Sequence, residues 1–136
     1  MNGLAAHASI LQDEVSGLQV GFSLPRVKTM DADPAFSPAR PVSDEDFVRS
    51  MLFLRLAHPS AHLTLTTREA PSIRDLSLAL GVSKLSAGVS TAPGGYVSTA
   101  GDEETGARAQ FDVADERSVD EIAALVSEAG LTPVFD

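Results

Sequence analysis

The residues with the clearest capacity for chemistry lie where predicted strands end. Residues 62–67, HLTLTT, alternate between apolar and polar side chains, which predicts a strand. Arg68 has the parity of Thr64 and Thr66, so we expect it on the polar face at the strand's carboxyl end. An arginine beside hydroxyl groups suits a carboxylate or phosphate, because the planar guanidinium binds bidentately. Arg68 is therefore a candidate anion receptor; the alternative is that Arg68 and Glu69 pair with neighbouring side chains at the rim.

Two further stretches alternate in the same way, and they are residues 18–24 and residues 83–89. The first ends at Ser23 and is followed closely by Arg26, which also fits the start of a solvated loop. The second places Ser86 on its polar face, with Ser90 just beyond it. Barrel enzymes perform their chemistry at the carboxyl ends of parallel strands, so these residues are expected near Arg68.

Helical patterns separate these strands, at residues 3–15, 43–57, 71–80 and 118–130. Ser43 precedes an acidic first turn, and Ser118 with Glu121 fits a capping box. Strands that alternate with helices pair in parallel through right-handed crossovers. The tail after residue 130 fits a last short extended segment, and the glycine- and acid-rich stretch 91–110 is expected to be a mobile loop.

Each predicted strand has one large apolar face and one small or polar face. The central strands of an ordinary doubly wound sheet are apolar on both faces, whereas polar faces suit the lumen of a barrel that holds a polar ligand. The predicted fold is therefore α/β: a partial (β/α) barrel of about three to four parallel strands with flanking helices, forming one domain over residues 1–136.

Composition excludes several classes of function. The chain has a formal net charge of −9, which makes it a poor candidate for binding nucleic acid or anionic membranes. No apolar run approaches the roughly 20 residues that span a bilayer. The first residues lack the basic region of a signal peptide, so the cytoplasm is the expected compartment. The sequence has no cysteine, which excludes disulfides, thiol nucleophiles and cysteine-held clusters on this polypeptide.

The histidines offer a weak metal motif. His58 and His62 are four residues apart, a spacing that can place two ligands on one face of a helix. Pro59 lies between them, and the segment HPSAH is more typical of a loop that joins a helix to a strand. We therefore expect two solvent-exposed loop histidines and no metal site.

Five short motifs, taken together and in this order, resemble a known family, although any one of them alone would be weak evidence. They are FSLPR, SDEDFV, TTRE followed by a proline two residues later, SAG leading into APGGY, and DERS followed by DE. This set resembles the C-terminal half of the radical S-adenosylmethionine tyrosine lyases, the region termed the biotin-and-thiamin-synthesis-associated domain. The resemblance covers roughly residues 4–135. The branch that serves thiamine thiazole biosynthesis is the first choice, and the branch that matures iron-only hydrogenase is the second.

The resemblance implies a barrel enzyme whose N-terminal cysteine motif holds a [4Fe–4S] cluster. That cluster cleaves S-adenosylmethionine, and the resulting radical splits tyrosine into dehydroglycine and a cresol product. By position in the family, Arg68 would bind the tyrosine carboxylate, and Thr66, Ser86 and Ser90 would line the same mouth. Ser23 and Arg26 would lie near the cofactor or substrate. The sequence assigns no catalytic residue.

The chain departs from the family where the cysteine motif should be. It starts at what would be the helix before the sixth strand of the barrel, and it carries no cofactor site of its own by this reading. It is then either the substrate-binding half that serves a cluster-bearing N-terminal partner, or a non-catalytic remnant or stand-alone module that binds small molecules. An opened barrel leaves strand edges unpaired, so the isolated chain is expected to be marginal, to aggregate or to dimerise through its edges.

Overall fold

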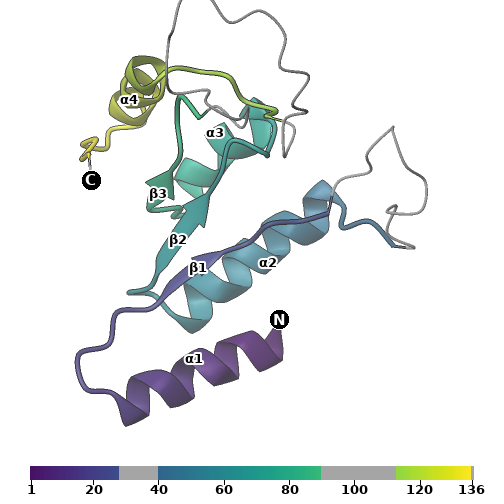
Figure 1. Ribbon diagram of the computed structural model, residues 1–136, viewed down its shortest axis with the longest axis vertical. Helices are drawn as coiled ribbons and strands as arrows, with labels where there is room; N and C mark the ends of the chain where they lie inside the picture. Colours follow the sequence, from purple (N-terminus) through teal and green to yellow (C-terminus); the bar gives the residue numbers. More distant parts are fainter. Residues whose placement is uncertain (28–39, 90–112, 136) are drawn as a thin grey trace, which may run out of the picture.

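The computed structural model describes residues 1–27, 40–89 and 113–135 (Figure 1). Helices and strands alternate along these ranges. The elements are α1 (Asn2–Glu14), β1 (Gly21–Ser23), α2 (Asp44–Ala57), β2 (His62–Leu65), α3 (Pro71–Ala79), β3 (Lys84–Leu85) and α4 (Val119–Glu128). The predicted loop 91–110 and Ser90 lie outside the described residues.

The helix starts follow local sequence signals. The Ser43 side chain accepts a hydrogen bond from the Asp46 backbone N–H, and three acidic residues occupy the first turn of α2. Ser118 caps α4, and Glu121 reaches back to the Ser118 backbone, which completes the capping box. Pro71 occupies the first turn of α3, where its missing N–H costs nothing.

The three strands form one parallel sheet in the order β1-β2-β3, so the predicted α/β class is confirmed and the sheet is not closed. Ser23 is paired with Thr64, and Thr64 with Lys84, which aligns these three residues across the sheet. The polar face predicted from parity is therefore continuous from strand to strand.

β3 is much shorter than the predicted stretch 83–89. Beyond Leu85, the Ser86 carbonyl accepts from Arg74 and the Gly88 N–H donates to the Arg117 carbonyl, so backbone groups find partners outside the sheet. Gly88 also adopts a φ of 59°, which no strand residue has. The tail is not a strand in residues 131–135, because its backbone has no neighbouring strand in the described ranges.

The hydrophobic core lies on one face of the sheet. Phe22, Leu63 and Leu65 are buried there against apolar side chains of the helices, among them Phe47, Met51 and Leu54 of α2. On the opposite face Gly21, Ser23 and His62 are exposed. The helices therefore cover the apolar face, and the polar face stays open in the described part of the chain.

Arg55 holds the amino-terminal end of the sheet together. Its guanidinium donates to the backbone carbonyls of Pro59 and Ala61 before β2 and of Gly81 before β3. One side chain therefore provides hydrogen-bond donors to three backbone carbonyl groups at the end of the sheet that lies opposite to the predicted site.

The expectation for the histidines is wrong for His58, which is buried. Its Nδ1 lies 3.1 Å from the Gln12 Oε1 and its Nε2 lies 3.0 Å from the Ala5 carbonyl oxygen, so the ring links α1 to the end of α2. The ring also packs against Phe22. His62 is exposed. Across the described ranges, no three His, Cys, Asp or Glu residues group together as a metal site.

No helix in the described part of the chain is long and apolar enough to cross a membrane.

Candidate functional site

Arg26 joins the carboxyl ends of β1 and β2. Its Nη2 lies 2.6 Å from Glu69 Oε2, and its Nε lies 3.0 and 3.1 Å from the two Glu69 oxygens. Nη1 donates to the Val42 carbonyl and Nη2 also pairs with Asp44, while the guanidinium stacks 4.7 Å above the Phe47 ring. The hydrogen bond with Glu69 is the main cause that raises the pKa of Arg26. Most of its donors are therefore used inside this chain.

Arg68 lies in the turn that follows β2, where the Glu69 N–H donates to the Thr66 carbonyl. Leu65, Thr67 and Glu69 are buried, whereas Thr66 and Arg68 are half-buried, so burial alternates into the turn although the strand has ended at Leu65. Glu69 pairs at the rim with Arg26, as the predicted alternative has it for Glu69. The role of Arg68 as an anion receptor stays a prediction.

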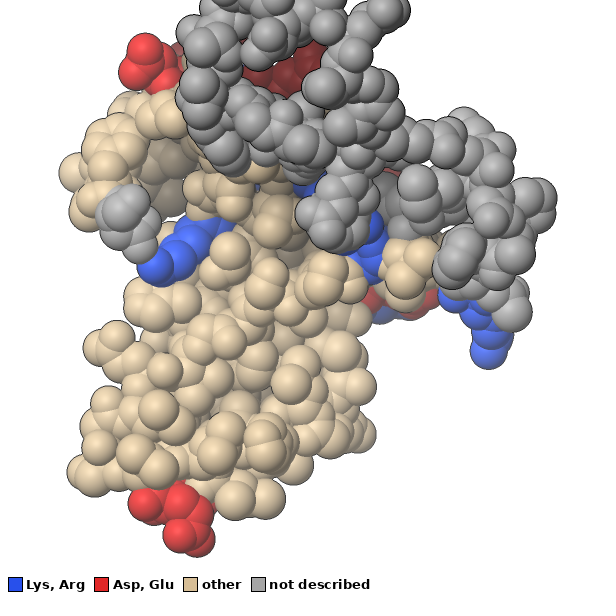
Figure 2. Space-filling model, viewed as in Figure 1, with Lys and Arg blue, Asp and Glu red and all other residues tan. Residues whose placement is uncertain are grey.

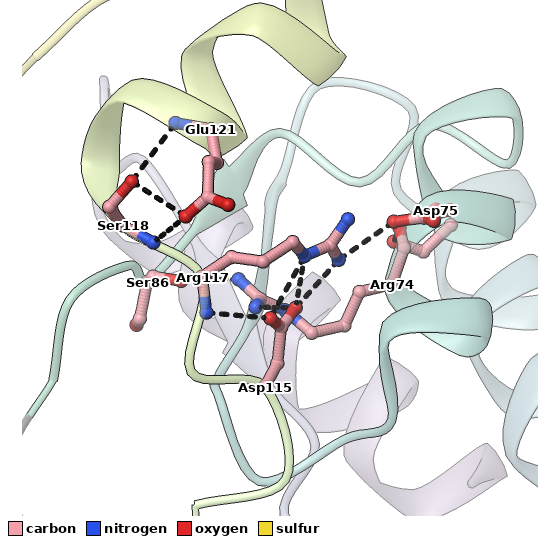
Figure 3. Close-up of polar contacts among 8 residues, drawn as sticks. Arg74, Asp75, Ser86, Asp115, Arg117, Ser118 and Glu121 are labelled. Atoms are coloured by element: carbon pink, nitrogen blue, oxygen red, sulfur yellow. Dashed lines mark hydrogen bonds and ion pairs between the residues drawn. The ribbon is translucent and has the colours of Figure 1, made fainter.

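A second charged cluster lies at the carboxyl end of β3, where Arg74 of α3 meets Asp115 (Figure 3). Both side chains are fully buried, with 0 % exposed surface. Arg117 donates to Asp115 from Nε and Nη2 and reaches Asp75 at 2.8 Å. Within the described residues, Arg74 Nε is a buried nitrogen without a hydrogen-bond partner. Two arginines thus share one buried carboxylate.

The electrostatics of this cluster follow from the contacts. The hydrogen bond from Arg117 is the leading cause that lowers the pKa of Asp115 to about 2. Burial lowers the pKa of Arg74, and Asp115 opposes that effect by Coulomb attraction. The hydrogen bond to Asp115 raises the pKa of Arg117. Asp115 is therefore ionised at neutral pH and balances the charge buried beside it.

The segment before α4 ties the ends of β2 and β3 together. The Thr67 carbonyl accepts from the backbone N–H groups of Ala114 and Asp115, at 2.9 and 3.0 Å. The Ser86 carbonyl accepts from Arg74 (Figure 3). The buried pair thus holds the backbone of Ser86 at the end of β3.

The predicted site residues of the described ranges gather at one end of the sheet. Ser23 ends β1 and Arg26 follows it, Thr66 and Arg68 follow β2, and Ser86 follows β3. Sequence reasoning missed Arg74 and Asp115 as the pair that supports these ends. Asp115 lies in the DERS motif, which is part of the resemblance to the family. Its contact with Arg74, however, arises only in the tertiary structure.

Comparison with known proteins places this arrangement in a family. Residues 23–132 match the family model of the Biotin and Thiamin Synthesis associated domain. The chain belongs to this family.

Relatives of this domain are larger enzymes. The chain is 30 % identical over 132 residues to 2-iminoacetate synthase from Escherichia coli, and equally to that of Salmonella typhimurium, in each case over 97 % of this chain and 33 % of the relative. It also resembles HydG, a maturase of the [FeFe]-hydrogenase, with a TM-score of 0.77, 31 % identity, and coverage of 96 % of this chain and 27 % of HydG. HydG from Carboxydothermus hydrogenoformans gives the same TM-score at 32 % identity, with coverage of 98 % of this chain and 29 % of that one.

The domain therefore spans about a third of the length of these relatives and corresponds to a C-terminal portion of them. This confirms the resemblance to the tyrosine lyases, and both branches that the motifs suggested are represented.

The residues of this domain do not fit an iron–sulfur cluster. The sequence contains no cysteine, and its described residues form no alternative group of metal ligands.

Proposed function

We propose that this domain is the substrate-binding C-terminal portion of a radical S-adenosylmethionine tyrosine lyase of the 2-iminoacetate synthase type. It would serve a cluster-bearing N-terminal portion and would not be competent alone. The cluster and S-adenosylmethionine supply the radical in the complete enzyme, whereas this chain binds and orients the amino acid.

The single observation that carries this proposal is the position of Arg68. It lies half-buried in the turn at the carboxyl end of β2, next to Glu69, which is held by its ion pair with Arg26. A half-buried guanidinium held on a rigid turn binds a carboxylate with little loss of conformational freedom. The family relationship makes the amino-acid carboxylate the natural anion.

The neighbouring hydroxyls complete the proposed mouth. Thr66 precedes Arg68 by two residues, and Ser86 lies just after the adjacent strand β3, where its backbone carbonyl accepts from Arg74. Ser90 is proposed to join them from the same strand end. Such hydroxyls can donate to a carboxylate or accept from an ammonium group. Ser23, the exposed last residue of β1, is proposed to contact the cofactor or substrate.

Arg26 enters the proposal in a different way. Its Nε and Nη2 groups are used by Glu69 and Asp44, so it reaches a ligand only by giving up part of that pairing. We therefore propose that Arg26 acts mainly through Glu69, as a positioning residue for the turn that carries Arg68.

Titration calorimetry with L-tyrosine tests the proposal, using this chain alone and assembled with an N-terminal portion. Arg68→Ala should weaken binding by about 1.5–3 kcal/mol, the scale of a charged hydrogen bond. The matched control is Arg49→Ala, because Arg49 lies exposed on α2 and pairs only with Glu45 and Asp46 in the described contacts. Arg49→Ala should leave the affinity unchanged. Equal affinities of wild type and Arg68→Ala would remove Arg68 from the site.

A further inference from the structure

Lys84 brings a positive charge to the polar face of the sheet. It is exposed on β3, whereas the next residue, Leu85, packs against the hydrophobic core on the opposite face. In the parallel register Lys84 lies beside Thr64, and Thr64 lies beside Ser23. Successive side chains of a strand leave it on opposite faces, so the Lys84 side chain leaves the sheet on the same side as these two hydroxyl groups.

The polar face is not acidic, although the chain is. The whole chain has a net charge of −9. The described strand residues on this face, none of which is acidic, are Gly21, Ser23, His62, Thr64 and Lys84. Figure 2 shows a basic side chain over β3, while the acidic side chains visible in this view lie away from that strand. A ligand against the polar face therefore meets hydrogen-bond donors and positive charge, which favour an oxygen acceptor.

Lys84 lies further back along the sheet than the proposed carboxylate site. Arg68 is four residues beyond Thr64, the register partner of Lys84. Because a strand rises about 3.3 Å per residue, the two levels are at most about 13 Å apart along the strand direction. The residues at the level between them, Thr66 and Ser86, have short side chains. An amino acid bound by its carboxylate at Arg68 can therefore extend a flat ring along the polar face towards Lys84.

We propose that Lys84 is a specificity residue of the same site and that its ammonium donates a hydrogen bond to the phenol oxygen of tyrosine. This inference rests on the proposed function, which concerns the opposite end of the amino acid. A lysine ammonium has three N–H donors, so Lys84 can serve the ligand while it keeps a contact within the chain. A site that bonds a substrate oxygen rejects the analogue that lacks it, because the site's polar group then loses its partner. Lys84 therefore selects tyrosine over phenylalanine.

Titration calorimetry with L-tyrosine and with L-phenylalanine tests this role, using the chain assembled with an N-terminal portion. The two ligands differ only in the phenol oxygen. Lys84→Met removes the charge and keeps most of the length of the side chain. The matched control is Arg49→Met, because Arg49 lies exposed on α2 and pairs with Glu45 and Asp46 there. Far-UV circular dichroism checks that both variants are folded, which the exposed positions allow.

We expect wild type to bind tyrosine about tenfold more tightly than phenylalanine, the scale of one charged hydrogen bond. Lys84→Met should weaken tyrosine binding by about the same factor and leave phenylalanine binding unchanged, because only tyrosine has the oxygen that the ammonium contacts. Arg49→Met should bind both ligands like wild type. Equal weakening of the two ligands in Lys84→Met, or no weakening of either, would overturn the role of Lys84.

The same titrations separate this role from that of Arg68. Both amino acids have the carboxylate, so Arg68→Ala should weaken both equally and preserve the preference for tyrosine. If Arg68→Ala binds both like wild type while Lys84→Met loses affinity for tyrosine alone, the proposed role of Arg68 is wrong and that of Lys84 stands. If the assembled wild type binds neither amino acid, both proposals are overturned.

Discussion

Arg74 and Asp115 illustrate at the residue scale how a buried charge depends on its partner. Both side chains are fully buried, and the Asp115 carboxylate also forms an ion pair with Arg117. Removing one partner of a buried pair leaves the other charge without compensation, which costs far more than the intact pair contributes. The pair therefore matters less as a source of stability than as a fixed link between α3 and the segment before α4.

Asp115→Asn should lower the free energy of unfolding by about 3–5 kcal/mol, because it leaves the Arg74 charge buried without its counter-ion. Urea denaturation followed by circular dichroism measures the change. Asp75→Asn is the matched control, since Asp75 pairs with the same Arg117 but is exposed. That control should cost at most about 1 kcal/mol. Similar losses in both variants would show that burial of the pair does not decide its contribution.

The same carboxylate predicts how stability depends on acid. Its pKa is about 2 in the folded chain and 3.8 ordinarily, so between these values the unfolded state binds the proton more readily. The contribution of Asp115 is therefore fully present above the ordinary value and is lost as pH falls towards 2. Urea midpoints measured from pH 5 to pH 2 should decline more steeply in wild type than in Asp115→Asn; parallel curves would contradict the assignment.

At the scale of the element, α4 depends on its first turn. Ser118 accepts from the Glu121 N–H, and the Glu121 carboxylate accepts from the Ser118 backbone N–H at 2.8 Å. Ser118→Ala should lower the free energy of unfolding by about 1 kcal/mol and increase hydrogen exchange in the first turn of α4. Ser127→Ala is the control, because Ser127 bonds back to Ala123 within the same helix and caps nothing. Comparable exchange in the two variants would argue against the capping box as the cause.

Most elements could be predicted from sequence because their signals are local. The caps at Ser43 and Ser118 and the alternation of residues 62–67 depend on neighbours within a few positions. The length of β3 could not be predicted, because its backbone bonds go to Arg74 and Arg117, which are distant in sequence from Ser86 and Gly88. The prediction that His58 is exposed was wrong for the same reason, because the partners of its ring lie on α1, far away in the sequence.

In the candidate site, too, local features could be predicted from sequence and long-range pairs could not. Parity predicts Arg68 on the polar face, but β2 ends at Leu65 and Arg68 lies in the turn after it, where strand parity does not fix the direction of a side chain. The pairing of Arg26 with Glu69 joins residues 43 positions apart, and the pairing of Arg74 with Asp115 joins residues 41 positions apart. No local pattern identifies such pairs in a single sequence. Sequence therefore predicted candidate residues at the strand ends, and only the structure shows the ion pairs next to them.

At the scale of the whole molecule, the sheet of the described residues has two open edges, and several apolar side chains in the same ranges are exposed. We expect it to be only marginally stable and to melt at a higher temperature when the N-terminal portion is added, because a ligand that binds the folded state alone stabilises it. Differential scanning fluorimetry at several partner concentrations measures the shift. A sharp, concentration-independent melt at ordinary domain stability would contradict this expectation.

The order of the sheet has a consequence for how the chain acquires its structure. Its strands lie in space in the order in which they occur in the sequence, and each new strand joins the one made just before it. Among the described strands, none has to wait for a later one to be inserted between it and its neighbour. Translation therefore presents each strand after the one with which it pairs, and each pairing costs closure of the connection between successive strands, residues 24–61 and 66–83.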